Sequence, residues 1–161
     1  LAPNEVTAVD VDFTPTSQTG FSGQICFHIT EPCDTTLCVP MNGTGIQSSV
    51  LVRKSSLNYG TLFLCQDSTL SLSIVNTGTA PLNLQGLAIT GTDAALFEET
   101  PPTSTPQTIA PGDSVVVTIR FVPGRSGTDG AKTATLEITT DDPAQPLIRV
   151  SLLGERRRQF R

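Results

Sequence analysis

Residues 68–90 read STLSLSIVNTGTAPLNLQGLAIT, and this stretch decides the fold class. Leu70, Leu72 and Ile74 alternate with serines, and this period of two predicts a strand with one buried face. The phrase NTGTAP that follows is rich in turn-forming residues, and a second apolar segment comes after it. The stretch therefore predicts two short strands joined by a turn.

Similar segments lie on both sides of this pair, with the turn phrases TGTD, APGD, PGRSGTDG and DDPAQP between them. Seven strands are expected, at approximately 57–64, 69–75, 82–90, 94–98, 114–122, 132–140 and 147–153. No long stretch keeps a helical period, although residues 94–97 could form one helical turn. Seven short strands in about 100 residues predict an all-β fold, an antiparallel β-sandwich of immunoglobulin type.

The composition excludes two classes of partner. The chain has 161 residues, a formal net charge of −5 and only 16% charged residues. An acidic chain is a poor partner for nucleic acid, whose phosphate backbone requires a basic surface. The sequence has no apolar run long enough to span a membrane. We therefore expect neither a nucleic-acid partner nor a membrane span.

The beginning of the chain resembles a later part of it. LAPNEVTAVDVDFTP (1–15) matches IAPGDSVVVTIRFVP (109–123), and residues 25–43 match residues 136–154. A repeat at this spacing is typical of an array of similar domains. We therefore expect the chain to begin halfway through one domain. The expected boundaries are a C-terminal half of about three strands at 1–45, a linker at 46–54, a complete sandwich at 55–155, and a basic tail or linker at 156–161.

Several turn phrases carry a resemblance to a known family. They are NTGTAPL (76–82), IAPGD (109–113), FVP (121–123) and TTDDPAQP (139–146). The chain resembles the immunoglobulin-like modules of the ASPM–SPD-2–Hydin (ASH) type, most closely their bacterial secreted form, which is often called the choice-of-anchor D domain. The resemblance implies that the chain is one of many consecutive modules in a long secreted or cell-surface protein. A related set of these modules works in cilia and at centrosomes.

The half domain poses a physical problem, because its inward face would lack a cover. We predict that this face docks the missing strands. Burying each large apolar side chain contributes roughly 1.5–3 kcal/mol, so an exposed face would be costly. The strands could lie upstream in a longer protein, come from another molecule by β-strand addition, or be replaced by packing on the neighbouring domain. The predicted docking face consists of Val9, Val11, Phe13, Ile25, Phe27, Ile29, Leu37, Val39 and Met41.

Four cysteines in a chain rich in Thr and Ser favour an oxidising compartment, and hence an extracellular or cell-surface location. A hairpin centred near Pro32 would place Cys26 opposite Cys38, within disulfide range. Cys26–Cys38 is the favoured bond, Cys33–Cys38 is the rival, and the sequence does not choose between them. Cys33 and Cys65 are candidates for a bond between neighbouring molecules.

Catalytic chemistry has little support. The only histidine, His28, is accompanied by no nucleophile motif, and no glycine-rich phosphate loop is present. Zinc at His28 and the nearby cysteines does not match the usual ligand spacing. Calcium at Asp129, Asp141 or Asp142 is an alternative, without EF-hand spacing. We therefore predict no enzyme, no catalytic residue and no cofactor.

The resulting hypothesis is a structural or interaction module, a spacer or building block of a large secreted or cell-surface bacterial repeat protein. Its partners would be other immunoglobulin-like modules of the same or a neighbouring chain. The alternative is a subunit of an extracellular filament, a homo-oligomer assembled by β-strand complementation. The third is a cytoskeletal or ciliary adaptor. In the tail, Arg156, Arg157, Arg158 and Arg161 are interpreted as a solvated linker, and Phe160 as a residue that seeks an apolar partner.

Overall fold

The computed structural model describes residues 5–30, 32–124 and 127–158. The chain divides into two compact units, unit 1 (Leu1–Ile46) and unit 2 (Gln47–Arg161). The expectations on residues 1–4, including the Ala2-Pro3 phrase, and on Phe160 and Arg161 lie outside the described residues. Among the described residues, no helix is long and apolar enough to cross a membrane.

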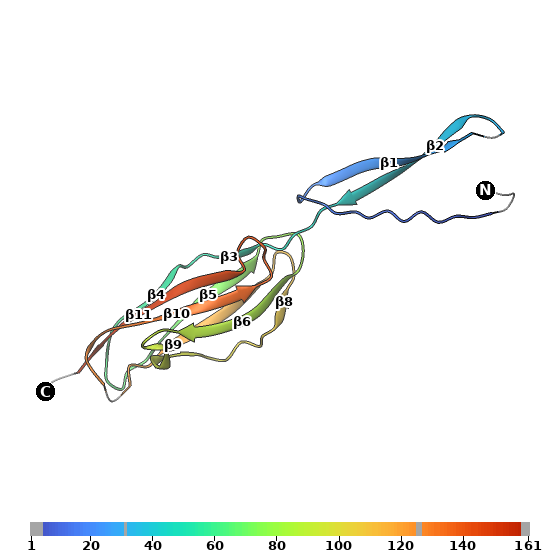
Figure 1. Cartoon of the computed structure of the whole chain (residues 1–161). Helices are drawn as coiled ribbons and strands as arrows, with labels where there is room; N and C mark the ends of the chain where they lie inside the picture. Colours follow the sequence, from blue (N-terminus) through green and yellow to red (C-terminus); the bar gives the residue numbers. More distant parts are fainter. Residues whose placement is uncertain (1–4, 31, 125–126, 159–161) are drawn as a thin grey trace. The chain divides into compact units, whose positions relative to one another are not determined.

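Unit 2 is an all-β sandwich of two sheets (Figure 1). Its five-stranded sheet has the order β4-β11-β10-β6-β8 and its four-stranded sheet the order β3-β5-β9-β7. The immunoglobulin-like sandwich predicted from the sequence is confirmed. The strands are β3 (Val50–Val52), β4 (Ser56–Phe63), β5 (Ser68–Asn76), β6 (Leu82–Thr90), β7 (Phe97–Glu99), β8 (Gln107–Ile109), β9 (Ser114–Phe121), β10 (Gly130–Thr140) and β11 (Leu147–Arg157).

The period of two fixes which side chains enter the core. Along β5, Leu72 and Ile74 are buried, and along β9, Val117 and Ile119 are buried. These two strands pair antiparallel, so their inward side chains form one continuous apolar layer. The predicted helical turn is a 3₁₀ turn at Ala94–Leu96, directly before β7.

One strand pair departs from the antiparallel expectation. Strand β4 runs parallel to β11, whereas the other paired strands of unit 2 are antiparallel. The pairing is interrupted at Gly60, which has a φ of +67° and lies where the register shifts beside Gly154. Glycine suits this position because it adopts positive φ without a steric penalty. The hydrogen-bonded pairing of β4 with β11 is therefore irregular at Tyr59-Gly60.

The expected linker 46–54 is partly a strand of the sandwich, which corrects the sequence-based boundary. Val50 is buried, and β3 pairs with β5 at the edge of the four-stranded sheet. The backbone N–H of Val50 donates to the carboxylate of Asp142 at 2.8 Å. A three-residue edge strand is too short to show a periodic pattern, and the equally short β8 was missed for the same reason.

The expected basic tail also begins inside the fold. Strand β11 continues to Arg157, and Arg156 is 1% exposed. The Nη1 atom of Arg156 lies so close to Gly127 that a Cβ there would stand 2.6 Å from it. The solvated-linker interpretation is therefore wrong for Arg156. Arg158 is exposed, and its backbone N–H donates to Asp129 at 3.3 Å.

Unit 1 contains one antiparallel hairpin, β1 (Gly20–Ile29) and β2 (Thr35–Thr44). Its register places Ile25 opposite Val39 and Cys26 opposite Cys38, as the sequence predicted. Residues 136 and 150, which match residues 25 and 39 in the sequence alignment, also face each other across β10 and β11. The two hairpins therefore share one register.

About three strands were expected in residues 1–45, but the described part forms two. Residues 5–15 lie outside any strand and run as a thread in unit 1 (dark blue in Figure 1). In the sequence alignment this thread matches the region of β9, which is hydrogen-bonded between β5 and β7 in unit 2. The described part of unit 1 contains no counterpart of β5 or β7, so the thread lacks the partners that would make it a strand.

Candidate functional site

The open apolar face of unit 1 is the candidate functional site. Val9, Val11 and Phe13 are 52%, 53% and 51% exposed. The residues that they match in unit 2 are all 0% exposed, namely Val117, Ile119 and Phe121. Side chains of similar chemistry are thus sealed in one unit and open to solvent in the other.

The hairpin adds its own apolar side chains to this face. Phe27 lies opposite Leu37, and Ile25 lies opposite Val39. Alternate residues of a strand share a face, so these side chains lie together with Ile29. Phe27, Ile29, Leu37 and Val39 are exposed, whereas Ile25 and Met41 are half-buried. The structure therefore carries the predicted docking residues on the hairpin and on the thread 5–15; whether this face docks strands stays a prediction.

Phe13 anchors the thread on the hairpin. A Cβ added at Gly43 would lie 2.7 Å from Cζ of Phe13, so the ring rests directly on the glycine. In unit 2, a Cβ at Gly154 would lie 2.8 Å from Cζ of Phe121. Both units therefore use a glycine to let a phenylalanine ring approach the strand backbone. Gly43 therefore belongs to the site. Its alignment with Gly154 is the feature of the sequence from which this role could have been predicted.

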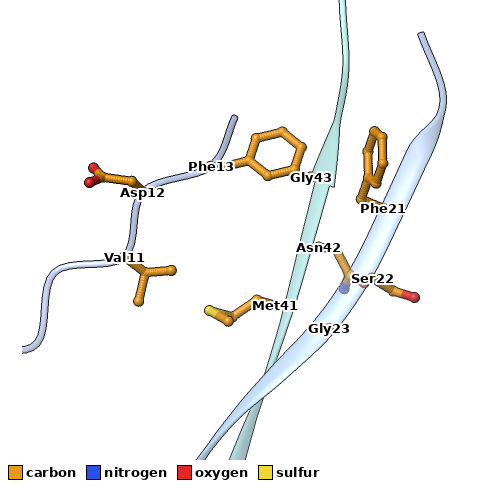
Figure 2. Close-up of a pocket in the computed structure, with 9 residues that line it drawn as sticks. All are labelled: Val11, Asp12, Phe13, Phe21, Ser22, Gly23, Met41, Asn42 and Gly43. Carbon is orange, nitrogen blue, oxygen red and sulfur yellow. The ribbon is translucent and has the colours of Figure 1, made fainter. Parts of the chain in front are cut away.

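A hollow of about 380 Å³ opens beside this ring. Figure 2 shows Val11 and Met41 facing each other across it, with the ring of Phe13 over Gly43. Phe21 also lines the hollow, and its ring centroid lies 5.7 Å from that of Phe13. Phe21 was missed from the sequence because it stands at the start of β1, next to a turn. The complete lining is Val11, Asp12, Phe13, Phe21, Ser22, Gly23, Met41, Asn42 and Gly43.

The corresponding space in unit 2 is filled by aromatic rings. Around Phe121, the ring centroid of Phe97 lies at 4.7 Å and that of Tyr59 at 5.5 Å. The hydroxyl of Tyr59 donates to the backbone oxygen of Ile119 at 2.9 Å, and burial raises the pKa of this hydroxyl. These two rings come from β4 and β7, for which the described part of unit 1 contains no counterpart.

In the described part of unit 1, neither edge of the hairpin has a neighbouring strand. Within the described residues, β1 and β2 pair only with each other. In unit 2, the outer edge of β10 is covered by β6 and that of β11 by β4. Free edges present unpaired backbone N–H and C=O groups, which can pair with another strand. Unit 1 therefore offers both an apolar face and open hydrogen-bonding edges.

A disulfide joins Cys26 and Cys38, whose Cα atoms are 4.0 Å apart. The matching positions in unit 2 hold Glu137 and Arg149, which form an ion pair at 2.9 Å. A cross-strand pair therefore links the hairpin at the same position in each unit, covalently in unit 1. Of the two remaining cysteines, Cys33 is exposed in unit 1 and Cys65 is exposed in unit 2, and neither is in a disulfide.

His28 lies on the exposed side of the hairpin. Its Nε2 is 3.0 Å from a carboxylate oxygen of Asp34, and its Nδ1 is 3.4 Å from the hydroxyl of Thr36. Within the described ranges, no three His, Cys, Asp or Glu side chains form a group that could hold a metal ion. Cys26, considered with His28 as a zinc ligand, is held in the disulfide.

The aspartates considered for calcium have structural contacts. Asp142 is buried and accepts hydrogen bonds from the backbone N–H groups of Val50 and Ala144, each at 2.8 Å. Asp141 accepts from the backbone and side chain of Asn83. These bonds fasten the β10–β11 connection to the ends of β3 and β6.

Three solved structures place this fold among known proteins. A protein of unknown function from Porphyromonas gingivalis W83 has a TM-score of 0.55 at 18% identity, over 88% of this chain and 68% of that chain. The periplasmic chaperone SfaE has a TM-score of 0.51 at 16% identity, over 70% of this chain and 61% of that chain. The ASH/PapD-like domain 7 of human CEP192 has a TM-score of 0.47 at 19% identity, over 69% of this chain and 87% of that chain.

These identities show the fold alone, an immunoglobulin-like sandwich. No protein-family model and no curated protein matches the sequence.

Proposed function

We propose that this chain is a structural and interaction module of a secreted or cell-surface bacterial repeat protein. In this proposal, unit 2 is a complete sandwich. Unit 1 is an incomplete sandwich that binds the strands needed to complete it. The ASH-type phrases of the sequence, including those typical of the choice-of-anchor D form, support this placement. A spacer or building block of this kind acts through shape and contact and needs no catalytic group.

The single observation that carries the proposal is the difference in burial between matching residues. Phe13 is 51% exposed, whereas the matching Phe121 is 0% exposed. Burial of apolar side chains is the main force that closes such sandwiches, at about 25 cal/mol per Å² removed from water. An apolar face that is sealed in one unit and open in the other is therefore suited to binding the missing strands.

Two observations support the proposed location. The Cys26–Cys38 disulfide of unit 1 would persist in an oxidising compartment. The fold is similar to that of a periplasmic chaperone, SfaE. Both favour a place outside the bacterial cytoplasm.

A second candidate is an extracellular filament subunit, in which another molecule supplies the missing strands. The exposed cysteines favour it, because Cys33 in unit 1 and Cys65 in unit 2 are both accessible for a bond between molecules. The two candidates use the same open face and differ in which polypeptide covers it.

The intact mass of the denatured, non-reduced polypeptide from its native source separates them. A mass many times 17.0 kDa that persists after reduction supports the repeat protein. A mass near 17.0 kDa per polypeptide, with large assemblies before denaturation, supports the filament. Disulfide-linked multiples that collapse on reduction support the Cys33–Cys65 bond. A 17.0 kDa species that is monomeric before denaturation contradicts both candidates.

A further inference from the structure

The hollow of unit 1 has a counterpart in unit 2 that the ring of Tyr59 fills. Tyr59 of β4 is 7% exposed and packs its ring against Phe121 at a centroid distance of 5.5 Å. Its hydroxyl donates to the backbone oxygen of Ile119 at 2.9 Å. Tyr59 therefore closes the core with an aromatic contact and one buried hydrogen bond.

Both contacts of Tyr59 have equivalents in unit 1. Phe121 matches Phe13, and Ile119 matches Val11, and both matching residues line the hollow. The ring of Phe13 rests on Gly43 as the ring of Phe121 rests on Gly154. Figure 2 shows Val11, Phe13 and Met41 around this space.

We propose that this hollow binds a tyrosine side chain. The tyrosine belongs to an extended segment with the pattern Leu-x-Tyr-Gly, and this segment pairs parallel to β2. The inference rests on the proposed function and adds the ligand's residue, direction and register. The tyrosine ring packs on Phe13, and its hydroxyl donates to the backbone oxygen of Val11.

The register follows from the β4–β11 pair. In unit 2, Leu57 lies opposite Leu152, and Thr61 lies opposite Glu155, with the irregularity at Gly60 between them. The hairpins share one register, so Leu152 corresponds to Met41 and Glu155 to Thr44. The incoming leucine therefore lies opposite Met41, and the residue after its glycine lies opposite Thr44.

The occupant is the first half of another module of this kind. A folded second copy of this chain cannot supply it, because Leu57 and Tyr59 of that copy are 2% and 7% exposed within their own sandwich. Exchange between copies would first require unit 2 to open. A first half that is not already packed in a sandwich of its own carries no such penalty.

A peptide of residues 53–64, RKSSLNYGTLFL, tests the inference on the full 161-residue chain. Amide hydrogen exchange followed by NMR measures which backbone groups the peptide protects. The expected result is protection along the outer edge of β2, with a shift of the Phe13 ring resonances. A Tyr59→Phe peptide should bind about fivefold more weakly, because it loses one hydrogen bond. A Tyr59→Ala peptide should bind at least about thirtyfold more weakly, because it loses the ring.

A matched pair of chain variants locates the site. Val11→Asp places a carboxylate in the hollow and should abolish peptide binding, while intact exchange protection between β1 and β2 shows that the hairpin remains folded. Val116→Asp is the control, because Val116 is similarly exposed, at 59%, but lies on β9 of unit 2. It should leave peptide binding unchanged.

Three results would overturn the inference. Equal binding of the wild-type and Tyr59→Ala peptides would show that the hollow does not bind a tyrosine side chain, although the docking function would stand. Protection of β1 in place of β2 would show that the direction and register are wrong. If neither this peptide nor residues 47–108 supplied as one polypeptide protects β2, the Leu-x-Tyr-Gly ligand is wrong. The native mass then still decides the proposed function independently.

Discussion

Gly154→Ala is expected to destabilise unit 2, because the added Cβ atom would collide with the ring of Phe121. The added Cβ would lie 2.8 Å from Cζ of Phe121, and Cε1 of the same ring would be closer still. Phe121 is 0% exposed and is packed against Tyr59 and Phe97, so its ring has no free space to enter. Overpacking of this kind typically costs about 1–3 kcal/mol of unfolding free energy, and we expect a value in the upper half of that range.

A control substitution separates this contact from the general effect of replacing glycine. Gly86 lies in β6, and a Cβ added there would meet no atom within 4 Å. Gly86→Ala should therefore change the unfolding free energy by no more than about 0.5 kcal/mol, or stabilise slightly by restricting the unfolded chain. Gly43→Ala, the counterpart in unit 1, should cost the β1–β2 hairpin less than about 1 kcal/mol by amide hydrogen exchange, because the half-exposed Phe13 can move aside.

The assay is urea denaturation followed by tyrosine fluorescence. The chain has one tyrosine and no tryptophan, so the signal reports Tyr59 in unit 2. A double-mutant cycle with Phe121→Leu isolates the contact, since the smaller side chain makes room for the new methyl group. We expect the double variant to be at least about 1 kcal/mol more stable than the sum of the single changes. The reasoning is refuted if Gly154→Ala lies within about 0.5 kcal/mol of the wild type, or if the cycle is additive.

Three further changes test other parts of the fold. Burial raises the pKa of Tyr59, so above pH about 10 this hydroxyl ionises only in the unfolded chain. The free energy of unfolding should therefore fall with rising pH, by up to about 1.4 kcal/mol per pH unit. Circular dichroism should show that Tyr59→Phe removes this alkaline loss; an unchanged pH dependence would contradict the assignment. Asp142→Ala leaves two backbone N–H groups without their acceptor and should cost about 2–4 kcal/mol by urea denaturation, whereas the surface change Asp129→Ala should cost under about 0.5. Reduction of the Cys26–Cys38 disulfide should lower amide protection in the β1–β2 hairpin about a hundredfold, and the β10–β11 hairpin serves as the internal reference. Equal protection of the β1–β2 hairpin before and after reduction would refute a stabilising role of the disulfide.

The sequence predicted the strands of unit 2 where an alternating pattern extended over many residues. The segments 82–90 and 114–122 agree with β6 and β9 to within one residue. Each carries several buried side chains at a spacing of two, and turn residues bound it. Strands β3 and β8 have three residues each, and pairing with a longer neighbour holds them in place. No local pattern reports such tertiary pairing.

Burial of Arg156 was not predictable for a different reason. A run of arginines normally indicates a solvated segment, because an arginine is rarely buried without a partner. Here β11 continues through the run, and strand alternation turns Arg156 inward while Arg157 stays exposed. Only the length of β11 reveals this, and that length depends on its neighbours β4 and β10.

The candidate site was predictable in part. The match between residues 1–15 and 109–123 is enough to predict that Val9, Val11 and Phe13 face inward. The sequence could not show that the thread would remain unpaired. That result follows from sheet topology, because the matching strand β9 pairs with β5 and β7 and not with its own hairpin.

Amide hydrogen exchange on the native assembly tests the central claim most directly, namely that other strands cover the open face of unit 1. The rates would be compared between the protein in material from its native source and the isolated 161-residue chain. The account predicts that amides of residues 7–13 and of the outer edge of β2 exchange rapidly in the isolated chain and are protected in the native material. Equal exchange at these amides in both samples would contradict it.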